Sequence, residues 1–225
     1  MKTVISILII LASSISYGQQ ATTLLSEVSA KVRSYDNIQI KFKYTLTNQK
    51  EGVNQQTFGD LTLLDDNYIL NMLDITRMFD GTSIYTIVPE DQEVTISLYN
   101  PEDEKDITPS QMLTFYEKGY DSKMGIVENI KGRKIQFVKL TPIYINAEIK
   151  KIHLGIDKKT KHIYKLIQID IKLTKYTLTV QSFKTNLPLS KILFTFHTQK
   201  YTTDGFSFSP LYTSYPTYHL PLFLL

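Results

Sequence analysis

The side chains able to do acid–base or metal chemistry are scattered along this chain. The four histidines, His153, His162, His197 and His219, have no second candidate ligand at the spacing of known metal sites. A lone histidine is usually a surface or hydrogen-bonded side chain, and we interpret all four in this way. The sequence also lacks a nucleophile elbow, a phosphate-binding loop and a dinucleotide-binding fingerprint.

Carboxylates are the remaining candidates for catalysis. Asp60, Asp74 and Glu148 could meet in space and act as acid and base, as in the β-rich glycosidases. Their spacing does not single them out, although catalytic sets do assemble from distant positions. We therefore expect no catalytic residue, no metal site and no cofactor, and a periplasmic hydrolase is the weaker alternative.

Composition excludes further classes of function. The chain has no cysteine, which excludes disulfides, thiolate catalysis and thiolate metal sites, and leaves no residue for a bacterial lipid anchor. Lys and Arg number 25 against 22 Asp and Glu, a formal net charge of +3. This excess is small and dispersed, so we expect no nucleic-acid partner.

The strongest pattern is an alternation of apolar and polar residues that is clearest in residues 38–46. Its apolar positions are Ile38, Ile40, Phe42, Tyr44 and Leu46. A period of two residues indicates a strand with one face in water, which a helix cannot use. The alternation returns along most of the chain, so many strands are expected to point apolar side chains into one interior. We expect that interior to hold an apolar ligand.

Turn residues divide this pattern into a series of strands. We expect them near residues 38–46, 57–64, 68–73, 76–79, 83–88, 94–99, 134–140, 149–156, 162–171 and 176–180. The early connections are too short for crossovers, so the meander should be antiparallel. Asp80-Gly81 favours a two-residue hairpin, and Gly59 indicates a bend within its strand. The predicted class is mainly β with a few α-helices.

Two segments show helical spacing instead. Apolar residues recur at intervals of three and four over residues 21–35, and Thr108-Pro109 can begin a second helix that Gly119 ends. The acidic run 100–106 lacks the spacing of a calcium loop, so we interpret it as a solvated loop before the helix. Both helices are amphipathic and could cover an open mouth. The covering residues would be Leu24, Leu25, Val28, Met112, Leu113, Phe115 and Tyr116.

The interior itself has two interpretations. An ordinary β-sandwich would produce the same alternation by packing two sheets together. Adaptable and amphipathic side chains, including those of Met72 and Tyr85, favour a cavity for a ligand of variable shape. The expected wall of that cavity consists of Ile38, Ile40, Phe42, Tyr44, Leu46, Leu70, Met72, Tyr85 and Ile96.

The two ends of the sequence differ from its middle. Residues 1–18 combine Lys2, an apolar run and small residues, which is typical of a cleaved secretory signal and too short for a membrane helix of about 20 residues. We therefore expect an unanchored periplasmic protein. Residues 186–196 suggest a helical turn and a last strand. Residues 201–225 fit neither period and are expected to be poorly ordered or loosely docked; an altered reading frame would also give such a tail.

The order of these segments resembles the LolA family of periplasmic carriers of outer-membrane lipoproteins. The resemblance extends from Ala21 to about Phe196. The matching segments are DGTSIYTIVPEDQEV at 80–94, TPSQMLTFY at 108–116, VKLTP at 138–142, IDKKTKHI at 156–163 and SFKTNLPL at 182–189.

This resemblance implies that residues 19–200 form an incomplete, open antiparallel β-barrel with a helical lid over an apolar cavity. It also implies a carrier without a cofactor, expected to be a monomer. The carrier would take acylated lipoproteins from an inner-membrane ABC-type release complex and pass them to an outer-membrane acceptor that the sequence does not identify. A periplasmic module that senses lipids or lipoproteins with a similar fold is the alternative.

Two features depart from the family pattern. Some members have an arginine soon after the second strand that latches the lid, and spacing from Gly59 places Asp65 there in this chain. The family usually ends in a charged segment, which residues 201–225 do not match. The sequence therefore does not predict how a lid would be latched, nor a role for the end of the chain.

Overall fold

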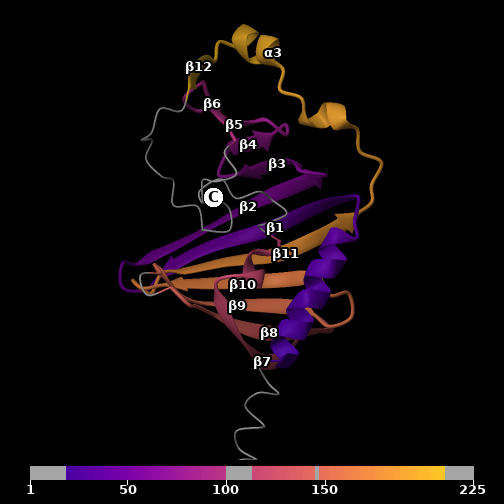
Figure 1. Ribbon diagram of the computed structural model, residues 1–225. Coiled ribbons are helices and arrows are strands. Elements are labelled where there is room, and N and C mark those ends of the chain that lie inside the picture. The colour runs from indigo at the N-terminus through magenta and orange to yellow at the C-terminus, as the bar shows by residue number, and fades with distance from the viewer. Residues whose placement is uncertain (1–18, 100–112, 145–146, 211–225) are drawn as a thin grey trace, which may run out of the picture. The chain divides into compact units, whose positions relative to one another are not determined.

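The computed structural model describes residues 19–99, 113–144 and 147–210, and Figure 1 shows its helices and strands. The expected secretory signal, the acidic loop, Met112 and residues 211–225 lie outside the described residues. The described part is mainly β-strand, which confirms the predicted class. One α-helix covers residues 19–33, and the other helical segments are η1 (Phe115–Glu117), η2 (Lys191–Phe194) and α3 (Thr198–Thr203).

The strands form one open sheet with the order β12-β6-β5-β4-β3-β2-β1-β11-β10-β9-β8-β7. The pairings from β2 to β6 and from β7 to β11 are antiparallel where their registers are defined, whereas β12 runs parallel to β6. The strands are β1 (Asn37–Asn48), β2 (Val53–Leu64), β3 (Asn67–Met72), β4 (Ile75–Phe79), β5 (Ser83–Val88), β6 (Glu93–Leu98), β7 (Tyr120–Ile130), β8 (Arg133–Pro142), β9 (Ile149–Asp157), β10 (Ile163–Asp170), β11 (Lys175–Thr185) and β12 (Ser207–Pro210).

The chain divides into two compact units. The first, called the helix unit, consists of the described residues within Met1–Val32, Thr45–Asn54 and Thr114–Thr179. The second, called the meander unit, consists of those within Arg33–Tyr44, Gln55–Leu113 and Val180–Leu225. Strands β1, β2 and β11 contribute residues to both units.

The core of the helix unit lies on one face of β8–β10. Val138, Leu154 and Leu166 are register partners across these strands and are fully or almost fully buried. The helix of residues 19–33 buries Ala21, Leu25, Val28 and Val32, whose spacing of three and four gives one apolar stripe. The predicted amphipathic helix is therefore confirmed.

Strand β7 is an edge strand that the alternation did not predict. Its side chains are mostly exposed, and its pairing with β8 shifts register between Met124 and Val127, which is a β-bulge. The buried Gln136 reaches this bulge, where its Nε2 donates to the carbonyl oxygen of Gly125 at 2.8 Å. A mostly exposed strand with a bulge has no regular apolar face, so periodicity could not reveal it.

Two predicted turns differ from the structure. Two-residue hairpin turns lie instead at Asp65-Asp66, Leu73-Asp74 and Lys131-Gly132, and at Leu73-Asp74 both residues have positive φ, at 55° and 60°. The connection at Asp80-Gly81 is longer, because β4 ends at Phe79 and β5 begins at Ser83. There the Asp80 carboxylate accepts hydrogen bonds from the backbone N–H groups of Thr82 and Ser83, both at 2.9 Å.

The end of the meander unit contains two elements that the sequence did not predict. No strand forms at residues 194–196; Phe194 ends η2 and is buried. Residues 198–210 form α3 and β12. The Phe196 ring stacks on Tyr85 at 4.1 Å and on Tyr201 at 5.0 Å, so aromatic packing attaches this segment to β5.

Gly59 pairs with Met72 at the start of the β2–β3 ladder. A Cβ at this position would lie 2.6 Å from both the Asn71 carbonyl oxygen and the Phe42 ring. Glycine is therefore required here because the Phe42 ring and the Asn71 carbonyl oxygen leave no room for a Cβ, and the bend stays a prediction.

The substitution Gly59→Ala should destabilise the chain by overpacking. We expect the free energy of unfolding to fall by about 1–3 kcal/mol, measured by denaturant unfolding. In the double variant Gly59→Ala/Phe42→Leu, the ring contact is relieved but the backbone oxygen contact remains. A double-mutant cycle should therefore show a smaller cost of Gly59→Ala in the Phe42→Leu background, and strict additivity would contradict this account.

Candidate apolar site

The alternating residues of β1 lie where the sequence predicted. Ile38, Ile40, Phe42 and Tyr44 are each at most 5 % exposed, and Leu46 is half-buried. The polar residues between them are exposed or half-buried. One face of β1 is therefore shielded from water, as its period of two requires.

Strands β2 and β3 of the meander unit extend this face. Register pairs share a face of the sheet, and β2 and β3 place Gly59 opposite Met72, Leu61 opposite Leu70, and Leu63 opposite Tyr68. Because the Phe42 ring lies over Gly59, the β1 residues on the Phe42 side belong to the same face. We call this face of β1–β3 the apolar face. Its members within the meander unit are Ile38, Ile40, Phe42, Tyr44, Gly59, Leu61, Leu63, Tyr68, Leu70 and Met72.

The apolar face ends at β4, where a charged side chain takes the next position in the row. Arg77 is opposite Leu70 and is half-buried, so a guanidinium side chain continues the row from β3 into β4. The apolar face of β1–β3 itself carries no charged side chain among the residues named above. The apolar face can therefore exclude water over three strands, and the Arg77 guanidinium lies at its edge.

Tyr85 and Ile96, which we expected in the same wall, lie on the other face of the meander. Ile69, Met78, Tyr85 and Ile96 are successive register partners, whereas Leu70 is paired with Arg77. Tyr85 stacks on Phe196 of the C-terminal segment, and its hydroxyl donates to Asp80 at 3.0 Å. Burial, and then the Asp80 carboxylate, raise the pKa of the Tyr85 phenol. These two residues are therefore not part of the apolar face.

The residues expected in a lid belong to two segments. Leu25 and Val28 of the N-terminal helix are buried and Leu24 is half-buried; all three are in the helix unit. Ser29 of this helix donates to the Tyr116 hydroxyl at 3.1 Å, and both residues are buried. The helix is thus tied to η1 by a buried hydrogen bond.

The segment around η1 holds the remaining lid candidates. Leu113 and Tyr116 are buried, and Phe115 is half-buried, with its ring edge-on to those of Tyr116 and Tyr120. The described part of the predicted second helix is only the short η1, which ends before the extended Lys118. Gly119 has a φ of +83°, as its predicted role in ending a helix requires.

Each unit contains a small hollow. The hollow in the helix unit has a volume of about 390 Å³ and lies between the helix and β7–β8, with Leu24, Met124 and Gln136 in its wall. The salt bridge between Glu27 and Lys161, at 2.5 Å, borders it. The hollow in the meander unit measures about 380 Å³ and includes Phe42, Gly59 and Met72.

The candidate catalytic carboxylates are accounted for by local structure. Asp60 accepts a hydrogen bond from Asn71 at 3.0 Å, and Asn71 in turn accepts one from Thr76 at 2.8 Å. Asp74 occupies the two-residue turn, and Glu148 is an exposed residue of the helix unit. Among the described residues, no group of three metal-binding side chains has the geometry for an ion.

Asp65, at the position where the resemblance implied an arginine latch, forms an ion pair instead. Its carboxylate lies 2.9 Å from Nζ of Lys191, in η2, and both side chains are exposed. The hydrogen bond and charge of Asp65 raise the pKa of Lys191. An exposed pair of this kind contributes little stability, so the two residues position the C-terminal segment at most weakly.

Comparisons with known proteins show the fold. No family model and no curated protein matches the chain. An uncharacterised conserved protein from Thermus thermophilus is 11% identical, with a TM-score of 0.56 and coverage of 83% of this chain and 98% of that one. This likeness shows a shared fold and carries no information on activity.

Other solved structures are similar at lower scores. A LolA superfamily protein from Nitrosomonas europaea is 12% identical, with a TM-score of 0.33 and coverage of 78% of this chain and 97% of that one. The lipoprotein LppX from Mycobacterium tuberculosis is 11% identical, with a TM-score of 0.44 and coverage of 75% and 98%. At these scores neither likeness carries an argument about the present chain. Within the described ranges, no helix is both long and apolar enough to cross a bilayer.

The substitution Ser29→Ala should weaken the attachment of the N-terminal helix. It removes a buried hydrogen bond to Tyr116, so the free energy of unfolding should fall by about 1 kcal/mol. The matched control is Ser26→Ala on the exposed side of the same helix, which should change stability by less than about 0.5 kcal/mol. Equal stabilities of the two variants in urea unfolding would show that the Ser29 bond contributes nothing.

Proposed function

We propose that this protein is a periplasmic carrier that binds the acyl chains of lipoproteins and shuttles them from the inner to the outer membrane. The observation that carries the proposal is the apolar face of β1–β3, where side chains from three strands combine without a charged residue. Acyl chains are recognised by such surfaces because they offer no hydrogen bonds and gain only from exclusion of water.

The energetics are sufficient for this role. Burying one methylene gives about 0.8 kcal/mol, so an acyl chain of about 15 methylenes gives at most about 12 kcal/mol. The cost of immobilising the cargo and opening the protein reduces this gain. Since the apolar side chains are already shielded from water, cargo has to replace the groups that shield them. The closed form should therefore be only slightly more stable than the open one.

The helical segments are the proposed lid. Leu24, Leu25 and Val28 of the N-terminal helix, with Met112, Leu113, Phe115 and Tyr116, are the residues that we expect cargo to displace. An inner-membrane ABC-type release complex would supply the acylated lipoproteins, and an outer-membrane acceptor would receive them. The carrier would act as a monomer, without a cofactor, after cleavage of its signal peptide.

The test is cargo retention by variants of β1. Phe42→Glu places a carboxylate in the apolar face, and we expect it to reduce co-purified lipoprotein or lipid at least tenfold, measured by mass spectrometry of protein purified from a periplasmic extract. The matched control is Gln39→Glu, which adds the same charge on the other side of β1 and should retain cargo. Circular dichroism checks the folding of both variants, and Phe42→Ala replaces Phe42→Glu if the latter is unfolded.

Equal retention by Phe42→Glu and Gln39→Glu would overturn the acyl-binding proposal. Carrier and sensor are separated by a second measurement, because only a carrier should be captured by components of the release complex. Cargo bound without such capture would favour the lipid- or lipoprotein-sensing alternative. Catalytic turnover that is lost with a carboxylate, such as in Asp60→Asn, would favour a hydrolase.

A further inference from the structure

Several lysines lie on the face of the helix-unit sheet opposite Val138, Leu154 and Leu166, while Ile135 and Phe137 share that face toward the other end of β8 and are buried. His153 is opposite both Lys139 and Ile167, and Lys139 is opposite Lys123, so these residues share that face. In the next row, Ile169 is opposite both Lys151 and Lys175. We call this surface the lysine face. Its members are Lys123, Lys139, Lys151, His153, Lys165 and Lys175.

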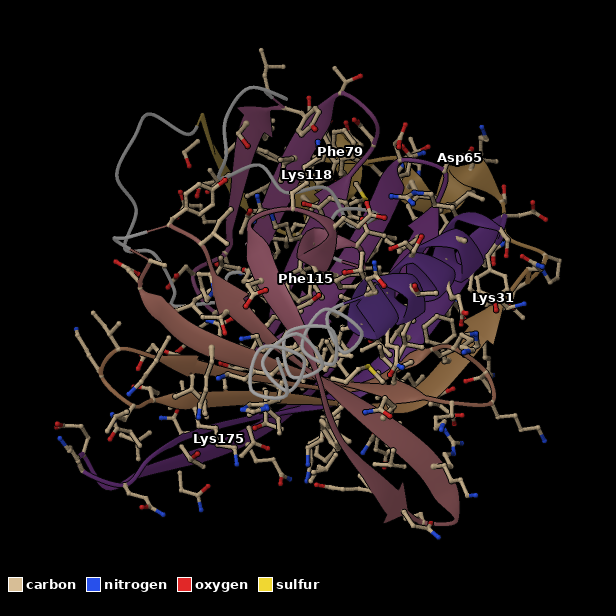
Figure 2. All side chains as sticks on the ribbon, turned by 60° about the horizontal axis from the view of Figure 1, so that its bottom comes forward. Lys31, Asp65, Phe79, Phe115, Lys118 and Lys175 are labelled. Carbon is tan, nitrogen blue, oxygen red and sulfur yellow. The ribbon has the colours of Figure 1, made fainter. Side chains whose placement is uncertain are left out.

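The lysine face points away from the N-terminal helix. In Figure 2 the helix that carries Lys31 and the label of Lys175 lie on opposite sides of the orange strands of this unit. The register agrees, because the core residues Val138, Leu154 and Leu166 alternate with the residues of the lysine face along β8–β10. In the helix unit, this face is not the one on which the helix packs.

The positive charges of this face are mostly uncompensated. Three carboxylates share this face: Asp121, 3.7 Å from Lys123; Glu128, opposite Ile135; and the buried Asp157, also opposite Ile135 and 4.0 Å from Arg133. Within the described residues, no carboxylate lies in ion-pair distance of Lys139, Lys151, Lys165 or Lys175. Burial, followed by the charges of Lys151, Lys139 and Lys175, lowers the pKa of His153. A cluster of like charges of this kind favours an anionic partner.

Exposed apolar side chains lie at one end of the same strands. Ile143 and Tyr144, after β8, are 62% and 71% exposed, and Ile171 and Leu173, between β10 and β11, are 63% and 47% exposed. The two loops are adjacent, because the Ile171 N–H donates to the Glu148 carbonyl oxygen at 2.9 Å. We call these four residues the apolar rim.

Leu173 has a φ of 67°, which fixes it in the tight turn between β10 and β11. Leu73 of the meander unit combines a positive φ with the same exposure, so the conformation alone does not indicate a partner. What distinguishes the rim is that four exposed apolar side chains lie in two adjacent loops.

We propose that the apolar rim and the lysine face together dock this protein on a bilayer that contains anionic phospholipid. Bilayer interfaces accept exposed aliphatic and tyrosine side chains at the boundary with the acyl chains, while adjacent lysines contact the headgroup phosphates. An acidic protein surface would account for the lysines. It would not account for the four exposed apolar side chains of the apolar rim. The proposal does not depend on acyl binding by β1–β3, and Phe42→Glu should therefore leave it intact.

The test is co-sedimentation of the full chain with vesicles of phosphatidylcholine alone or of phosphatidylcholine with one quarter phosphatidylglycerol. The unmodified chain should bind the anionic vesicles more tightly, and added salt should weaken this binding. The triple variant Lys139→Gln/Lys151→Gln/Lys175→Gln should lose about tenfold or more in affinity, since each lysine near such a surface is worth about a factor of five. Ile171→Ser/Leu173→Asn should lose binding without a change in charge.

The matched control is Lys134→Gln/Lys158→Gln/Lys159→Gln, which removes three exposed lysines at the opposite ends of β8 and β9. This control also accounts for any vesicle binding by residues 1–18, which every variant shares. As an independent readout, NMR titration of His153 should give a higher pKa with anionic vesicles than without, because the phosphates offset its three lysine neighbours.

Two results would overturn the proposal. The first is equal affinity of the lysine-face triple variant and the control triple variant for anionic vesicles. The second is equal binding of the unmodified chain to both kinds of vesicle. Absence of any vesicle binding, with capture of an acidic protein that the lysine-face variant loses, would likewise overturn it and assign the surface to a protein partner.

Discussion

Exclusion of water from one face of β1 is the constraint on which the rest of the meander unit depends. Alternate residues of this strand are apolar and must be covered, so β2 and β3 have to present their own apolar residues on the same side. A shift of register by one residue would move every one of these side chains into water. The Phe42 ring adds a local requirement, since its place over β2 is open only to glycine.

The opposite face of the meander is protected in a different way. It carries Tyr85 and Ile96, and the C-terminal segment contributes Phe196, Tyr201 and Phe208 to the aromatic cluster around Tyr85. Both faces of this part of the sheet therefore hold apolar side chains. This explains why composition and alternation do not distinguish between the two sides, and why the wall expected from sequence mixed residues of both.

The sequence predicted side-chain burial best for strands with one buried and one solvent-exposed face. Residues 38–46 predicted the shielded side of β1 because the period of two is unbroken over the whole segment. Tyr85 and Ile96 were assigned to the wrong side of the meander because β4–β6 carry apolar residues on both faces, and only the strand register separates the two. Strands β7 and β12 were missed since neither shows regular alternation, and their places depend on Gln136 and on aromatic contacts distant in sequence.

The bulge in β7 affects whether copies of this protein can associate through the edges of their sheets. An outermost strand with free carbonyl groups invites a neighbouring molecule to extend the sheet, particularly where Ile126 stands exposed. The irregular backbone between Met124 and Val127 interrupts the even ladder that an incoming strand needs. The Gln136 amide holds this irregularity from the β8 side, so the outer strand is a poor template for fibre-like growth.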